Sequence, residues 1–301
     1  MCASLLPNFF MTVRVIVLVS FLCLGAVREG YGQRVYANTE QNSGKQELLL
    51  LTVSEVTNPT RSTNSNENTY STLNVAIGAL NLYSATQNLQ FTGINAIKLK
   101  PNSPIMVKTM VNGSVLGLLD AVSRQRTNGG MNNTVGAPYT VTQLLDLLGI
   151  IGGTDEELLV VLPVPGVSET NDGVQLKVNS VLSLGLSARL YYAFYITPPE
   201  LDSQEIILCD GQSGQAIISN FYMENGVPYT YRLYNQQIGG IEVAPSTNTN
   251  TFTIPANLPE GDYYLEAREN DLYPSARTKI TVSVQPQPPA PILNINPNSQ
   301  Y

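Results

Sequence analysis

The sequence predicts an all-β protein built from two consecutive β-sandwiches. Short apolar stretches alternate with polar residues at period two over most of the chain, as expected of half-buried strands. Gly, Pro, Asn and Ser separate these stretches, which is typical of turns between short strands. Two adjacent prolines at 198–199 divide the strands into two groups, and each group is long enough for one sandwich.

The first residues predict an export signal rather than part of the fold. Arg14 precedes an apolar run at 15–26, and small residues follow at Gly30 and Gly32. The run is shorter than the roughly 20 residues of a membrane-spanning helix, so we expect no transmembrane segment in the mature chain. Cleavage after Gly32 would make residues 1–32 a signal peptide. A lipid anchor at Cys23 is disfavoured because the bulky Leu22 precedes it.

Residues 33–198 are expected to form the first sandwich. The predicted strands lie at 47–53, 72–77, 89–91, 105–110, 158–162, 174–178 and 189–196. The continuous apolar run at 47–53 predicts a central strand. Thr140 and Gln143 have the spacing of a helix capping box, and apolar residues follow at helical intervals up to a Gly-Gly stop at 152–153. A weaker helical turn is predicted at 114–122.

Residues 199–284 are expected to form the second sandwich, of immunoglobulin-like type. Its predicted strands lie at 215–219, 229–235, 251–254, 263–269 and 278–284. Residues 285–301 read as a Pro-rich linker followed by the start of a possible further module.

Composition excludes several kinds of chemistry. The sequence contains no His, and after loss of the signal only Cys209 remains of its three cysteines. Catalytic triads and His- or Cys-based metal sites are therefore ruled out. Cys209 follows an apolar run and is predicted to be a buried small hydrophobe, with an intermolecular disulfide as the alternative. The net charge of −7, without a Lys/Arg cluster, argues against nucleic acid as a partner.

Two segments resemble discoidin-like (galactose-binding-like) domains of secreted bacterial surface proteins. Asn58-Pro59 and the stretch 64–73 (NSNENTYSTL) resemble the family's "NP…DGN-x-x-T-Y-S-T-L" segment. The segments 172–176, 182–185 and 189–191 resemble its closing strands. The resemblance implies a jelly-roll-type sandwich, here with one or two short helices, and glycan binding through loops.

The same resemblance implies a structural calcium ion held by this loop, with Asn64, Asn66 and Glu67 as its ligands. The chain departs from the family pattern, because Asn64 stands where the family has Asp and Ser65 where it has Gly. Calcium prefers several oxygen ligands that include carboxylates, whereas Asn and Ser also close turns without an ion. We therefore expect a loop that is hydrogen-bonded to itself, with the calcium site as the alternative and no other cofactor.

The stretch 258–264 (LPEGDYY) resembles the corner of bacterial Ig-like and fibronectin-III-like modules. In that corner a tyrosine at the start of a late strand bonds back to the preceding turn. Tyr263 or Tyr264 would fill this structural role, and alternation should bury one of them.

Three functions remain compatible with the sequence. The first is an exported, non-catalytic binding or adhesion module at the cell surface or in the medium, with a surface polysaccharide or another surface protein as partner. The second is a structural stalk segment of a larger surface protein, and the third is an ancillary domain of a secreted enzyme. The first is preferred because of the export signal, the resemblance at 64–73 and the absence of catalytic groups, including any carboxylate pair singled out for glycosidase chemistry. No catalytic residue is assigned, and the ligand-binding residues stay unknown at this point.

Overall fold

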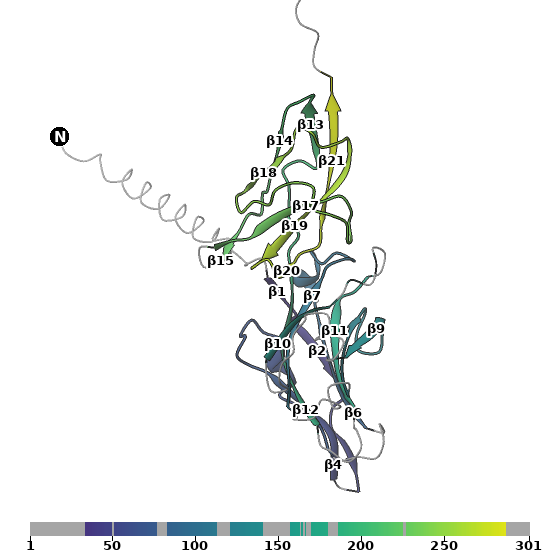
Figure 1. Cartoon of the computed structure of the whole chain (residues 1–301). Coiled ribbons are helices and arrows are strands. Elements are labelled where there is room, and N and C mark those ends of the chain that lie inside the picture. The colour runs from purple at the N-terminus through teal and green to yellow at the C-terminus, as the bar shows by residue number, and fades with distance from the viewer. Residues whose placement is uncertain are drawn as a thin grey trace, which may run out of the picture.

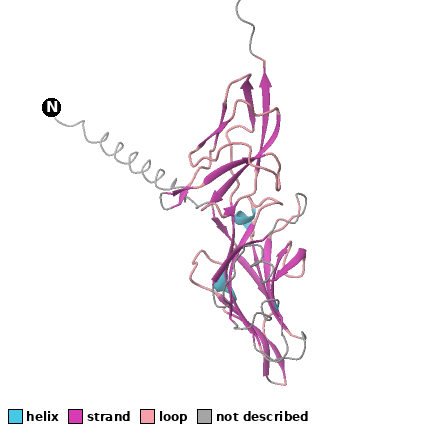
Figure 2. Ribbon diagram, viewed as in Figure 1, coloured by secondary structure: helices cyan, strands magenta, loops and turns pink. Residues whose placement is uncertain are grey.

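The computed structural model describes residues 34–49, 51–76, 83–112, 121–140, 157–162, 164, 166, 170–179, 186–224 and 227–286. These residues form β-strands, joined by loops and by two short 3-10 helices, η1 (Pro59–Ser62) and η2 (Gly93–Ala96) (Figure 2). The predicted all-β class is confirmed. The expected signal peptide at 1–32 and nearly all of the linker at 285–301 lie outside the described residues.

The first sandwich packs a seven-stranded sheet against a five-stranded sheet. The larger sheet runs β10-β7-β12-β5-β4-β3, and β1 also pairs with β12. Its strands are β1 (Arg34–Tyr36), β3 (Gln46–Leu48), β4 (Leu51–Thr57), β5 (Ser71–Val75), β7 (Ile105–Asn112), β10 (Glu157–Leu162) and β12 (Leu186–Ile196). The smaller sheet runs β2-β6-β11-β8-β9. Its strands are β2 (Thr39–Asn42), β6 (Ser84–Gln90), β8 (Val122–Thr127), β9 (Thr134–Thr140) and β11 (Gly173–Asn179).

From β5 onward the chain repeatedly crosses between these two sheets, as in jelly rolls. Alternate residues of each strand point inward and fill the space between the sheets with apolar side chains such as Leu73, Val107 and Leu190. Two arginines are buried in the same layer. Arg126 donates to the Asn171 side chain at 2.8 Å and to the Ser103 carbonyl at 3.1 Å, while Arg124 donates to the Thr109 hydroxyl.

The second group of strands has the first and last strands of its main sheet side by side and parallel. That sheet runs β13-β21-β19-β17, with the short β20 beside β19, and it is accompanied by the pairs β14-β18 and β15-β16. The strands are β13 (Glu205–Cys209), β14 (Gly214–Ile217), β15 (Met223–Glu224), β16 (Val227–Pro228), β17 (Thr230–Tyr234), β18 (Thr251–Ile254), β19 (Gly261–Glu269), β20 (Tyr273–Pro274) and β21 (Thr278–Gln285). The buried Tyr263 donates its hydroxyl to the Pro259 carbonyl at 2.8 Å, across the turn that precedes β19, while Tyr264 lies half-buried on the other face.

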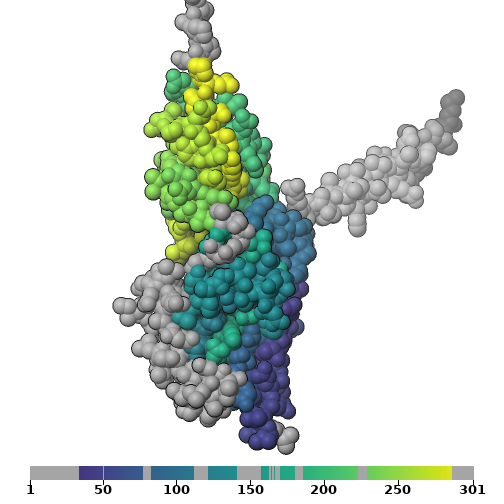
Figure 3. Space-filling model, turned by 90° about the vertical axis from the view of Figure 1, so that its right-hand side faces the viewer, coloured from purple at the N-terminus to yellow at the C-terminus, as the bar shows by residue number. Residues whose placement is uncertain are grey.

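The two sandwiches meet end to end and share one apolar cluster (Figures 1 and 3). The outer face of the seven-stranded sheet supplies Met106, Tyr192 and Phe194 to this cluster, while the second sandwich supplies residues such as Tyr231. The Phe194 ring meets the Tyr273 ring edge to face, with centroids 6.3 Å apart. Burial of these aromatic rings removes apolar surface of both sandwiches from water, which favours one fixed arrangement.

Arg34 of β1 forms an ionic lock across this junction. Its guanidinium donates to both oxygens of Glu269 on β19 and to Glu67 in the β4–β5 loop. It lies over the Phe194 ring, 4.6 Å from the centroid. The hydroxyl of Tyr36 also donates to Glu67, and that of Tyr229 donates to Glu269 at 3.1 Å. We call Arg34, Glu67 and Glu269 the junction triad.

Burial and hydrogen bonds set the ionisation of this group. Burial works against the charge on Arg34, but hydrogen bonds with Glu269 and Tyr36 outweigh it and raise the pKa of the guanidinium above its ordinary value. Burial, together with the hydrogen bond to Glu67, raises the pKa of Tyr36 to about 12. Arg34 therefore stays charged and Tyr36 stays a hydroxyl donor over the whole physiological range.

The prediction of a central strand at 47–53 is wrong. The apolar run turns back on itself, with Leu49 in the left-handed region at φ 49°, and becomes the hairpin of β3 and β4. β3 is the outermost strand of its sheet. Leu48, Leu49 and Leu51 are consequently 49%, 88% and 71% exposed rather than buried.

The prediction of a buried Cys209 is also wrong. Ile206 and Leu208 point into the core, so alternation along β13 turns Cys209 outward, and the thiol is free and exposed. The predicted helices fall mostly outside the described residues. Of their described ends, Thr140 and Val122 belong to strands β9 and β8, while Ala121 has 3-10 helical conformation.

We predict that replacing Arg34 with methionine uncouples the two sandwiches. The change leaves two carboxylates without their cation, and Glu269 is almost wholly buried, so the junction should lose about 3 kcal/mol. Thermal unfolding monitored by calorimetry should then separate into two transitions. Arg34→Lys keeps the charge but not the forked geometry, and should lose less.

The matched control is Lys45→Met at the exposed Lys45–Glu47 ion pair, which should leave the unfolding profile unchanged because water screens an ion pair on the surface. An Arg34→Met protein that still unfolds in one transition at the wild-type temperature would contradict the role of the junction triad.

Candidate functional site

The loop between β4 and β5 is hydrogen-bonded to itself. The side-chain oxygen of Asn64 accepts from the Asn66 amide at 2.9 Å, and that of Asn66 accepts from the Asn68 amide at 3.1 Å. The Thr69 hydroxyl donates to the Arg61 carbonyl at 2.9 Å and also contacts the Asn64 oxygen. These contacts close two Asx turns without help from an ion.

Glu67, the third proposed calcium ligand, is bound by side chains of β1 instead. Glu67 accepts hydrogen bonds from Arg34 and Tyr36, so its charge is already compensated within the junction triad. The described residues contain no group of three or more His, Cys, Asp or Glu side chains that could hold a metal ion. Asn64, Asn66 and Glu67 therefore do not fit a calcium ion, which needs several free oxygen ligands.

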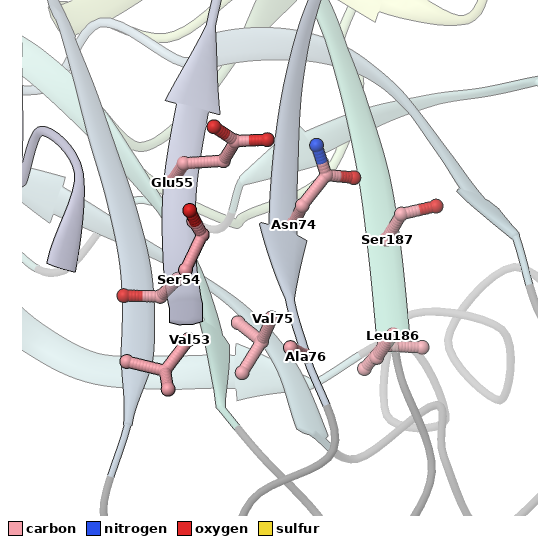
Figure 4. Close-up of a pocket in the computed structure, with 9 residues that line it drawn as sticks. Val53, Ser54, Glu55, Asn74, Val75, Ala76, Leu186 and Ser187 are labelled. Atoms are coloured by element: carbon pink, nitrogen blue, oxygen red, sulfur yellow. The ribbon is translucent and has the colours of Figure 1, made fainter. Parts of the chain in front are cut away.

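A shallow groove of about 370 Å³ lies at the β3–β4 end of the seven-stranded sheet. Glu55 on β4, Asn74 on β5 and Ser187 on β12 are cross-strand neighbours in its wall, because register pairs Glu55 with Asn74 and Asn74 with Ser187. Figure 4 shows the three side chains on adjacent strands, pointing to the same side of the sheet. All three are half-buried. We call them the polar ladder.

Apolar residues and two small hydroxyl residues make up the rest of the groove lining. Its remaining lining residues are Thr52, Val53, Ser54, Val75, Ala76 and Leu186. Within the described residues, neither the Glu55 carboxylate nor the Asn74 amide makes a hydrogen bond or an ion pair. Two polar groups therefore face the groove with their bonding capacity directed to solvent.

A second row of side chains crosses the same face next to the ladder. Arg189 lies two residues along β12 from Ser187 and stacks over the Tyr70 ring at 4.5 Å. Its guanidinium also contacts the Met110 sulfur at 3.7 Å. The charge of Arg189 is thus held against an aromatic ring and a polarizable sulfur.

The far edge of the face carries an ion pair. Lys108 on β7 contacts Glu157 on β10 at 2.6 Å and lies 4.8 Å from the centre of the Tyr191 ring. The hydrogen bond from Lys108, followed by one from Tyr191, lowers the pKa of Glu157. Both charges of this pair are therefore compensated at neutral pH.

Among the described residues, this face lines up three polar side chains and brings no second carboxylate close to Glu55. A carboxylate, an amide and a hydroxyl in line offer hydrogen-bond acceptors and donors to a hydroxyl-rich molecule. Glu55 is the one carboxylate among the groove residues, and Glu157 lies four strands away, or about 19 Å. Paired glycosidase carboxylates lie no more than about 10 Å apart.

Sequence reasoning did not single out the polar ladder. Alternation in β5 correctly places Asn74 on the opposite face from Leu73. The signal that could have found the site is a polar residue at the outward position of three different strands. What was missing is the register, which brings residues 55, 74 and 187 together from distant parts of the chain.

The abundant tyrosines of β12 take the packing role that was expected. Tyr191, Tyr192 and Tyr195 are each no more than 3% exposed. Burial raises the pKa of the Tyr195 hydroxyl, which donates to the Asn95 carbonyl at 2.7 Å. Their rings are therefore not open platforms for stacking on a sugar.

No protein-family model matches the sequence, and a search of curated proteins finds no match. Among solved structures, the chain is similar to a β-1,2-glucanase from Parabacteroides distasonis, with 12% identity, a TM-score of 0.36, and coverage of 86% of this chain and 37% of that one. It is also similar to the family 30 carbohydrate-binding module of a cellulosomal cellulase from Clostridium thermocellum, with 6% identity, a TM-score of 0.31, and coverage of 55% and 97%.

A third similar structure is the BSP domain of a biofilm-associated protein, with 10% identity, a TM-score of 0.22, and coverage of 75% of this chain and 54% of that one. At TM-scores this low, these similarities support no conclusion about the function of this chain. In the described part of the chain, no helix is long and apolar enough to cross a membrane.

We predict that removing calcium leaves stability unchanged. Because the oxygens of Asn64, Asn66 and Glu67 are already engaged by protein groups, a chelator should leave the melting temperature unchanged within measurement error. Loss of an ion that contributed about 1 kcal/mol would lower the melting temperature by about 2–4 °C in a cooperative unit of this size. Thermal melts with a chelator and with added calcium provide the test. A calcium-dependent rise of several degrees, abolished by Glu67→Gln, would show that an ion binds here.

Proposed function

We propose that this chain is an exported, non-catalytic module that binds polysaccharide through the groove of its first sandwich. The observation that carries the proposal is the polar ladder of Glu55, Asn74 and Ser187 across three neighbouring strands. Sugars present hydroxyl groups at regular intervals along a chain. A row of side-chain acceptors and donors fixed by strand register suits such a ligand.

The extent of the face suits an oligosaccharide better than a single sugar. The ladder and the row at Arg189 extend the polar surface across β4, β5, β12 and β7, with neighbouring strands about 4.8 Å apart. The groove is partly open to solvent and is not an enclosed cavity. A polymer chain could therefore enter it from the side.

We further propose that the first sandwich is discoidin-like and the second Ig-like. The crossing of the chain between two sheets supports the first assignment. For the second, support comes from the parallel pairing of β13 with β21 and from the Tyr263 hydroxyl on the Pro259 carbonyl. In this arrangement the second sandwich is a rigid support that holds the binding face at a fixed angle.

A structural stalk is the second candidate, and the junction triad favours it. An ionic lock over a shared apolar cluster resists bending between the sandwiches, which is what a stalk requires. Retention of polysaccharide distinguishes the two candidates: a binding module retains it and a stalk does not.

Binding to insoluble polysaccharides and to a glycan array tests the proposal. The wild-type chain should be retained by at least one glycan, and Asn74→Ala should weaken this binding about fivefold, the effect of one lost hydrogen bond of about 1 kcal/mol.

Asn179→Ala is the matched control, because Asn179 is a half-buried asparagine on the five-stranded sheet. It should bind as the wild type does. Absence of any retained glycan, or equal weakening by the two substitutions, would favour the stalk.

A further inference from the structure

The charges on the groove face are unevenly compensated. Lys108 is paired with Glu157, whereas Arg189 keeps its charge and stacks on Tyr70. Among the acidic groups of this face, Glu55 has no ion pair or hydrogen bond within the described residues. A negative charge therefore stands alone in the wall of a groove whose other polar lining is neutral.

Lys45 interacts electrostatically with Glu55, but it is bound to a different carboxylate. Lys45 is the cation whose field reaches Glu55, but its ammonium is held by Glu47 at 2.5 Å. Both Lys45 and Glu47 are about half exposed, so water also screens them. Glu55 thus keeps most of its capacity to attract a cation from solution.

The neighbours of Glu55 determine which cations can reach it. Asn74 stands directly across from Glu55 on the next strand, and Ser187 follows on the third. A bare metal ion would find one carboxylate with an amide and a hydroxyl, which is too few oxygen ligands for calcium. An ammonium group on a hydroxyl-bearing ring would place its charge at Glu55 and its hydroxyls at Asn74 and Ser187.

From this arrangement we propose that the groove selects oligosaccharides that carry free amino groups, and that Glu55 is the specificity-determining residue. The proposal rests on the polysaccharide-binding function proposed above and names its ligand class. The ammonium of the sugar donates to the Glu55 carboxylate. Uronic or sulfated sugars are rejected, because their negative charge would meet Glu55 in a chain whose net charge is −7.

Calorimetric titration with three sets of oligosaccharides of equal length tests this inference. The sets are glucosamine oligomers, their N-acetylated counterparts and glucuronate oligomers. Glucosamine oligomers should bind the wild type two- to fivefold more tightly than the N-acetylated ones, as expected of a partly exposed ion pair. Glucuronate oligomers should bind most weakly, and the amine preference should fall as salt is raised.

Two substitutions that each remove one negative charge distinguish attraction of the amino sugar to Glu55 from its attraction to the net negative charge of the chain. Glu55→Gln should abolish the preference for the amine, so that glucosamine oligomers and their N-acetylated counterparts bind the variant with equal affinity, whatever the change does to binding as a whole. Glu205→Gln, at an exposed position of β13 in the second sandwich, should keep the full preference. A preference that survives Glu55→Gln would reflect attraction to the acidic chain as a whole and would overturn the inference.

The failure of this inference can be told apart from failure of the proposed function. If N-acetylated or neutral oligomers bind, and Asn74→Ala weakens them, while glucosamine oligomers bind no better, then the groove binds glycans but Glu55 does not select amines. If none of these oligomers binds but another glycan is retained on the array, this inference is wrong and the proposed function stands; if no glycan is retained at all, both proposals are wrong.

Discussion

The arrangement of the molecule depends on one half-buried cation between two acidic groups. Arg34 comes from the first described strand, Glu67 from a loop about thirty residues later, and Glu269 from the other sandwich. Desolvating these groups is costly, and only close pairing and the additional donors Tyr36 and Tyr229 make it favourable. The lock forms only when all three segments are in place, so it makes the position of each conditional on the others.

This constraint connects the β4–β5 loop to the binding face. The loop leaves β4 shortly after Glu55 and enters β5 shortly before Asn74, so its two ends lead directly into the polar ladder. Its inner side is anchored by Gln87, which donates to the Pro59 carbonyl at 2.8 Å and to the Ser62 hydroxyl at 3.0 Å. A loop held at both its inner side and its tip keeps the two strands in register, and register is what aligns the ladder.

Local pattern was enough to predict the fold class but not the site. Period-two alternation identifies strands such as β5 and β19, and the Tyr263 corner follows from a turn with a tyrosine after it. The hairpin at Leu48–Leu51 shows the limit, because an apolar run has the same composition whether it crosses a core or turns back at an edge.

The buried arginines and the partners of Glu67 could not be predicted because they depend on contacts between distant parts of the chain. Arg124 and Arg126 occupy inward positions of β8 that would ordinarily be apolar, and burial lowers the pKa of each guanidinium to about 10. The sequence around Glu67 indicates a polar loop, yet its partners lie 33 and 31 residues away at Arg34 and Tyr36. Such pairings depend on the complete topology and cannot be predicted from the local sequence.

The central claim is that the two sandwiches behave as one cooperative body. Differential scanning calorimetry of the unmodified chain tests this most directly, by comparing the calorimetric enthalpy with the van't Hoff enthalpy. A single transition with equal enthalpies is the result that the shared cluster and the junction triad predict. Two resolved transitions, or a calorimetric enthalpy near twice the van't Hoff value, would contradict it.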